Sequence, residues 1–201
     1  MSNIDYIFEE KAADIGNFLV GRLLPFKQKR SIGPFVFIDH MGPIDLKAGE
    51  NLDVAPHPHI GLSTLTFLFE GAVHHKDSLG NDVIIEPGAV NWMTAGKGVV
   101  HSERTPDHLR EVSKTMHGLQ IWIALPKELE NMEPNFVHVE ESELPVWTEG
   151  KADFKLIAGD FEDKKAGVPV YSKLYMMEIK AHEDQTINLH ERLYGESGLY
   201  I

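Results

Sequence analysis

The chain has 201 residues, of which 42% are hydrophobic, and this is enough apolar material for one or two folded domains. Its formal net charge of -12 argues against direct binding of nucleic acid, because phosphate contacts require clustered lysines and arginines. Cysteine is absent, which excludes disulfides and thiolate metal sites, so any bound metal would need histidine, aspartate or glutamate ligands.

The sequence shows no targeting signal. Its first residues contain neither the basic segment nor the apolar segment of a signal peptide. No uninterrupted apolar run approaches the length of a membrane span. We therefore expect a cytoplasmic protein that has no membrane partner.

The first two thirds of the chain alternate short runs rich in β-branched and aromatic residues with glycine and proline turns. Such runs predict strands, and turn signals at short intervals favour a β-sandwich or a β-barrel. The fold class expected from these residues is therefore all-β. The predicted strands are Phe35–Ile38, Ser63–Phe69, Val83–Ile85, Val90–Met93 and Leu119–Ala124.

Residues 127 to 150 are polar and turn-like, and we place a domain boundary near residue 135. The boundary separates an N-terminal domain, residues 1–135, from a C-terminal domain, residues 136–201. Strands are predicted at 154–157, 171–179, 186–189 and 198–201. These strands are too few to repeat the first unit, so we expect an incomplete second barrel. Its open sheet edges invite pairing with the first unit or with a second copy of the chain, as a homodimer.

Two short motifs predict a metal site. His57 and His59 are two residues apart, so on an extended strand their side chains point to the same face. His101 and Glu103 repeat this spacing. If the two segments face each other in a barrel, three nitrogens and one carboxylate oxygen converge on one ion. This donor set suits Fe, Mn, Ni, Cu or Zn.

Glycines flank both motifs, at Gly61 and at Gly96 and Gly98, and allow close turns there. A lone His-x-His on a surface strand is more often accidental than a ligand pair. The two pairs, the glycines and the all-β context together favour the metal site. The simplest interpretation of His74 and His75 is that they belong to a hairpin. For His117, Trp92 and Trp122, both a packing role and a place near the site remain open.

The chain resembles the pirins, a branch of the cupin superfamily. The similarity is strongest over residues 33–126 and is carried by 37–43, 57–62, 69–71, 77–80, 92–103 and 117–122. It implies a bicupin fold, in which two β-barrels lie face to face and only the N-terminal barrel holds a metal, usually iron. It also implies that His57, His59, His101 and Glu103 are the ligands of that metal. Mn, Ni, Cu and Zn remain alternatives to iron.

The sequence departs from the pirin pattern in two respects. Many pirins have a glutamate at the position of Ser63, so a proton-transfer role for that acid cannot be carried over to this chain. Pirins also usually run well beyond 201 residues, which is why the resemblance implies only a partial second barrel.

The resemblance implies two kinds of function. The first is a quercetin 2,3-dioxygenase-like activity, in which a flavonol such as quercetin is opened by O2 and Glu103 acts as both metal ligand and catalytic base. The second is a non-enzymatic regulator, whose metal sets the surface shown to a transcription factor or a metabolic enzyme. A purely structural metal is a third interpretation. We expect the dioxygenase.

Overall fold

The computed structural model describes residues 4–16, 18–189 and 191–201, and these form strands, turns and short 3-10 helices. No helix among them has the length and apolar character that crossing a bilayer requires. The elements of the first part are β1 (Lys11–Asp14), β2 (Leu19–Leu24), β3 (Phe35–Leu46), β4 (Val54–His59), β5 (Leu62–Glu70), β6 (Val73–Asp77), β7 (Asp82–Ile85), β8 (Val90–Thr94), β9 (Val99–Arg104), η1 (Asp107–Leu109), β10 (Lys114–Ala124), η2 (Lys127–Leu129) and β11 (Asn135–Val139). The remaining elements are η3 (Glu141–Glu143), β12 (Val146–Glu149), β13 (Ala152–Phe161), β14 (Lys164–Lys165) and β15 (Tyr175–Ala181).

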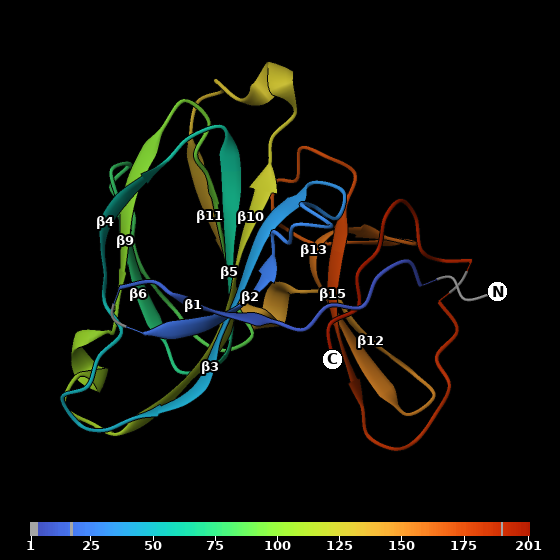
Figure 1. Ribbon diagram of the computed structural model, residues 1–201, viewed down its shortest axis with the longest axis horizontal. Coiled ribbons are helices and arrows are strands. Elements are labelled where there is room, and N and C mark those ends of the chain that lie inside the picture. Colours follow the sequence, from blue (N-terminus) through green and yellow to red (C-terminus); the bar gives the residue numbers. More distant parts are fainter. Residues whose placement is uncertain (1–3, 17, 190) are drawn as a thin grey trace.

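Two antiparallel sheets build the N-terminal barrel. One has the strand order β1-β2-β3-β10-β5-β8-β11, and the other has the order β4-β9-β6-β7. A third sheet, β12-β13-β14 with β15 paired to β13, forms the C-terminal part. Figure 1 shows the first two sheets on the left of the molecule and the third on the right, against β5 and β10.

The main hydrophobic core lies between the seven-stranded sheet and the third sheet. Leu65, Phe67 and Ile121 belong to the first of these sheets, and Leu156 and Phe161 belong to β13; all five are almost completely buried. Alternate residues of a strand point to opposite faces. The other face of the seven-stranded sheet is therefore left for more polar residues, and this face looks toward β4 and β9.

The structure confirms an all-β protein with a complete N-terminal barrel and an incomplete second one. The predicted strands of the first part all lie within observed strands. In the C-terminal part, the predicted strand 154–157 lies within β13, and residues 175–179 of the predicted strand 171–179 lie within β15. The first four residues of 171–179 and the predicted strands 186–189 and 198–201 lie outside the strands. Strand β11, which begins at the predicted domain boundary, pairs with β8 of the first barrel.

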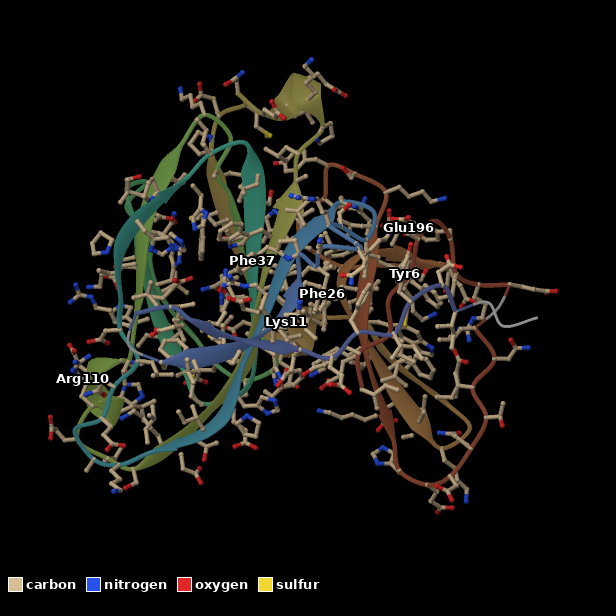
Figure 2. All side chains as sticks on the ribbon, viewed as in Figure 1. Tyr6, Lys11, Phe26, Phe37, Arg110 and Glu196 are labelled. Carbon is tan, nitrogen blue, oxygen red and sulfur yellow. The ribbon has the colours of Figure 1, made fainter. Side chains whose placement is uncertain are left out.

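The C-terminal segment after β15 is held by side-chain contacts instead of strand pairing. Arg192 donates hydrogen bonds to Glu149 and Glu162. Glu196, labelled in Figure 2, pairs with Lys29 at 2.5 Å. Residues 186–189, whose sequence suits a strand, lie outside the sheets.

Candidate metal centre

Strands β4 and β9 bring the two sequence motifs together. The strands are antiparallel neighbours, and His57 lies directly opposite His101. The imidazole centroid of His101 is 4.4 Å from that of His57 and 4.9 Å from that of His59. One ring nitrogen from each of the three histidines lies within 4.8 Å of the others. The i, i+2 spacing of His57 and His59 and the pairing of β4 with β9 therefore place three potential nitrogen ligands close together.

Burial keeps two of these histidines neutral. His59 is 7% exposed and His101 is 2% exposed. Burial, with a further contribution from the neighbouring His57, lowers the pKa of His59 to about 4 and that of His101 to about 2. A neutral imidazole has a free lone pair, which is the form that binds metal ions. The cluster is therefore ready to accept a cation at neutral pH.

Two buried atoms in the cluster lack hydrogen-bond partners. They are Nε2 of His101 and Oε1 of Glu103. Buried polar atoms in native proteins nearly always have a partner, so such atoms require an explanation. Nδ1 of His57 contacts the carbonyl oxygen of Ala55 at 2.9 Å, and by donating there it leaves the Nε2 lone pair free. These donors fit a divalent metal ion.

Glu103 lies at the edge of the histidine cluster. Its Oε1 is 3.7 Å from Nδ1 of His101, and it is not part of the three-residue group. Burial raises the pKa of the Glu103 carboxyl group from 4.5 to about 7. The structure thus brings His57, His59 and His101 together, with the carboxyl group beside them. Coordination of a metal by all four side chains stays a prediction.

An aromatic wall faces the cluster from the seven-stranded sheet. The Trp122 ring lies edge-on to His59, with 5.1 Å between centroids, and Phe37 stacks on Trp122 at 4.1 Å. The guanidinium of Arg22 covers Phe37 and forms two hydrogen bonds of 2.8 Å with Asp39. Figure 2 labels Phe37 in the interior of the barrel. Of the two roles left open for Trp122, the structure supports a place near the site, whereas Trp92 is buried in the main core.

Two further residues lie beside the cluster: His75, for which the sequence analysis favoured a place in a hairpin, and Asp77, which it did not consider as a site residue. His75 on β6 is 2% exposed, and its Nδ1 lies 3.4 Å from Nδ1 of His101. Its Nε2 contacts the carboxylate of Asp77 at 3.1 Å. The signal that could have found them is a third i, i+2 pair, His75 and Asp77. His117, by contrast, pairs with His40 through a 2.9 Å contact between their Nε2 atoms, away from the cluster.

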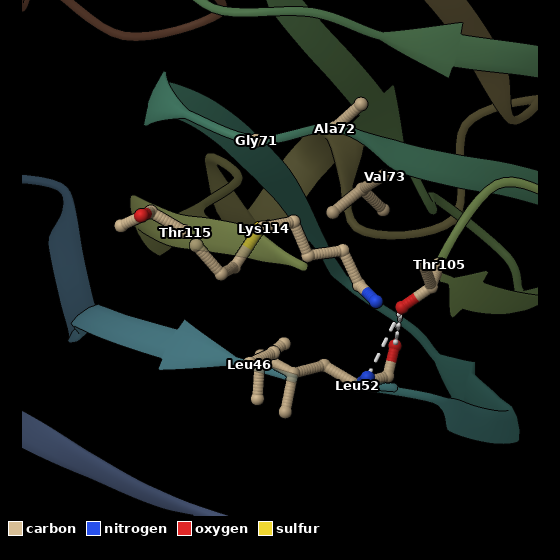
Figure 3. A pocket seen from close by; sticks show the side chains of 9 residues that line it. Leu46, Leu52, Gly71, Ala72, Val73, Thr105, Lys114 and Thr115 are labelled. Carbon is tan, nitrogen blue, oxygen red and sulfur yellow. Dashed lines mark hydrogen bonds between the residues drawn. The ribbon is translucent and has the colours of Figure 1, made fainter. Parts of the chain in front are cut away.

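A separate small pocket lies at the end of the barrel where β3 and β9 terminate and β10 begins. Its volume of about 10 Å³ has room for roughly one water molecule. Leu46, Val73 and Thr105 are among its lining residues (Figure 3). In the same view, the Thr105 hydroxyl is hydrogen-bonded to the backbone N–H and carbonyl groups of Leu52. None of the candidate metal ligands lines this pocket.

Comparisons with known proteins agree with this geometry. Residues 17–123 match the family model described as Pirin. A "Pirin-like protein" of Caulobacter vibrioides is 48% identical over 98% of this chain and 69% of its own length. Two crystal structures described as quercetin 2,3-dioxygenase from Acinetobacter baumannii are 42% and 28% identical, with TM-scores of 0.82 and 0.77. They match 88% and 85% of this chain.

The matches cover most of this chain but a smaller share of the two Acinetobacter chains. The chain spans only 57% and 61% of the two Acinetobacter chains. The family match, the Caulobacter relative and the likeness to these structures show that the chain has the cupin fold and belongs to the pirin family.

Proposed function

We propose that the chain is a metal-dependent dioxygenase of quercetinase type, which uses O2 to open a flavonol. The observation that carries the proposal is the histidine cluster, in which three ring nitrogens lie within 4.8 Å of one another beside the buried Glu103 carboxyl. The two Acinetobacter structures described as quercetin 2,3-dioxygenase support the choice of substrate. Iron is the ion we expect, with Mn, Ni, Cu and Zn as alternatives.

His57, His59, His101 and Glu103 would hold the ion. When bound, it would supply Lewis acidity toward a substrate oxygen. Glu103 would accept the proton of the flavonol hydroxyl, because burial has already moved the pKa of its carboxyl close to neutrality. In the metal-free protein a carboxyl group with such a pKa is about half ionised at pH 7, so it can both accept and release a proton there.

The aromatic wall would bind the flat rings of the substrate. Trp122 lies next to His59, and Phe37 stacks on Trp122 and backs it. Aromatic pairs prefer offset or edge-on contacts, and a planar polyphenol can make both. Gln120 lies two residues before Trp122 on β10. Its side-chain oxygen accepts a hydrogen bond from the Thr66 hydroxyl at 2.9 Å, which leaves its side-chain NH2 group to donate to substrate hydroxyls. These residues would therefore hold the flat ring beside the histidine cluster.

Oxygen uptake tests this proposal. Protein loaded anaerobically with Fe²⁺ is mixed with a panel of flavonols and with flavones that lack the reacting hydroxyl. We expect oxygen consumption with the flavonols alone, and a strong loss of turnover in His101→Ala. His182→Ala should keep turnover, because His182 is exposed directly after β15 and its side chain contacts Asp153. If fully metal-loaded protein consumes no oxygen with any flavonol, the dioxygenase proposal is wrong and a regulatory role gains support.

A further inference from the structure

Strand β6 lies on the far side of β9 from β4 and carries a second polar pair toward the cluster. In the β6–β9 register, Asp77 lies opposite His101 and His75 lies opposite Glu103. Alternation along β6 directs His75 and Asp77 inward, where their side chains are 3% and 0% exposed. The alternate residues His74 and Lys76 point outward, and both contact Asp82 on the surface.

The hydrogen bonds around Asp77 fix its role as an acceptor. Its carboxylate receives the backbone N–H groups of Leu79 and Asn81 at 2.9 and 3.0 Å, and the Asn81 side-chain amide at 2.8 Å. These donors hold the carboxylate ionised and in a single orientation. An ionised carboxylate can only accept, so the 3.1 Å contact with His75 requires a proton on Nε2 of His75.

The proton position on His75 determines the proton position on His101. With its proton on Nε2, neutral His75 has a lone pair on Nδ1, which faces Nδ1 of His101 at 3.4 Å. A hydrogen bond between these two nitrogens then requires the proton on Nδ1 of His101, which donates it to His75. Its lone pair is left on Nε2, the atom that is buried without a partner. The ring of His75 is held in place by stacking on Phe136, with centroids 4.5 Å apart.

We propose that Asp77 and His75 are positioning residues that fix the tautomer and orientation of His101, so that Nε2 of His101 is presented to the metal ion. This inference rests on the proposed function, because it assumes that His101 is a ligand of a bound metal ion. A carboxylate or carbonyl that binds the remote N–H of a ligand histidine commonly sets its tautomer and raises its basicity. Here the carboxylate acts through an intervening imidazole.

The test uses the full chain and the variant His75→Phe. Phenylalanine keeps an aromatic ring stacked on Phe136 but removes the acceptor for His101. The matched control is His74→Phe, which makes the same change one residue away on the outward face. Affinity is measured by chelator competition with Ni²⁺ and, anaerobically, with Fe²⁺. We expect His75→Phe to bind about 10- to 100-fold more weakly and His74→Phe to bind like the wild type. A second variant, Asp77→Asn, keeps His75 but allows its tautomer to invert, and should also weaken binding.

The protonation of the ring nitrogens is measured directly by long-range ¹H–¹⁵N NMR on the metal-free protein. We expect His101 protonated on Nδ1 and His75 protonated on Nε2 in the wild type, with His101 changing tautomer in Asp77→Asn. The wild-type spectrum tests the inference even if no metal binds, an outcome that would overturn the proposed function alone. A proton on Nε2 of His101, or equal Ni²⁺ affinities in the His75→Phe variant and the wild type, would overturn the inference.

Discussion

The buried carboxyl group of Glu103 should destabilise the metal-free protein at neutral pH. Its pKa rises from 4.5 to about 7 on burial. Below pH 4.5 the group is protonated in both the folded and the unfolded chain, so it contributes no penalty. Between the two values the unfolded chain loses the proton and the folded chain keeps it. Stability therefore falls as the pH rises through this range, and the full penalty is present above pH 7.

The magnitude follows from the two pKa values. At about 1.4 kcal/mol per pH unit, the difference between 4.5 and about 7 corresponds to about 3 kcal/mol. This is an upper value, because 14% of the Glu103 side chain remains exposed. In Glu103→Gln the titrating group is gone. The stability of the variant relative to the wild type should then increase by up to about 3 kcal/mol between about pH 4 and about pH 8.

Denaturant unfolding of chelator-treated protein across this pH range provides the assay. Any constant cost of burying the glutamine amide cancels, because only the pH dependence of the difference is used. Glu133→Gln is the control: its carboxylate is 80% exposed and pairs with Lys97 on the surface. With Fe²⁺ or Ni²⁺ present at neutral pH, the wild type should be more stable than Glu103→Gln, because the variant has lost an anionic ligand of the metal. A difference between the metal-free proteins that stays flat with pH would refute this reasoning.

Three further outcomes are expected. Leu156→Ala removes a fully buried side chain from the core shared by the seven-stranded and third sheets, so it should lower the free energy of unfolding by about 2–5 kcal/mol. Thermal unfolding should then show one shifted transition, and two separate transitions would argue against a shared core. Gly42→Ala should unfold at a lower temperature, because Gly42 has φ +80° and a Cβ atom would lie 2.0 Å from the carbonyl oxygen of Met116. Hydrogen bonds from Arg192 lower the pKa of Glu149, so their contribution is present above pH 4.5 and is lost as the pH falls through the lowered value. The stability difference between wild type and Arg192→Ala should therefore shrink on acidification, and a constant difference would exclude this pair as its source.

The candidate site was predictable where local strand geometry decides it. His57 with His59 and His101 with Glu103 are i, i+2 pairs, and extended strands place such pairs on one face. The pairing of β4 with β9 then brings the histidines together. The deviation of Glu103 from the three-histidine group could not be predicted, because it depends on side-chain rotation in the folded barrel.

Other parts of the site and fold depend on contacts between distant segments. The contact between His75 and His101 arises only from the register of β6 with β9, and the edge contact between Trp122 and His59 arises only when two sheets face each other. Residues 186–189 have a strand-like sequence, yet this segment remains outside the sheets, next to Arg192, which is tied to Glu149 and Glu162. The sequence pattern alone shows neither the register in which strands pair nor the side-chain contacts between distant segments. The boundary between residues 1–135 and 136–201 stays a proposal, and β11 shows that the first barrel draws on residues beyond it.

Metal stoichiometry tests the central claim most directly. Elemental analysis of protein loaded with Fe²⁺ and then freed of unbound ion should find one ion per chain in the wild type and in His182→Ala. His101→Ala removes the buried nitrogen that has no other partner, so it should hold little or none. Equal metal content in His101→Ala and the wild type would contradict the account.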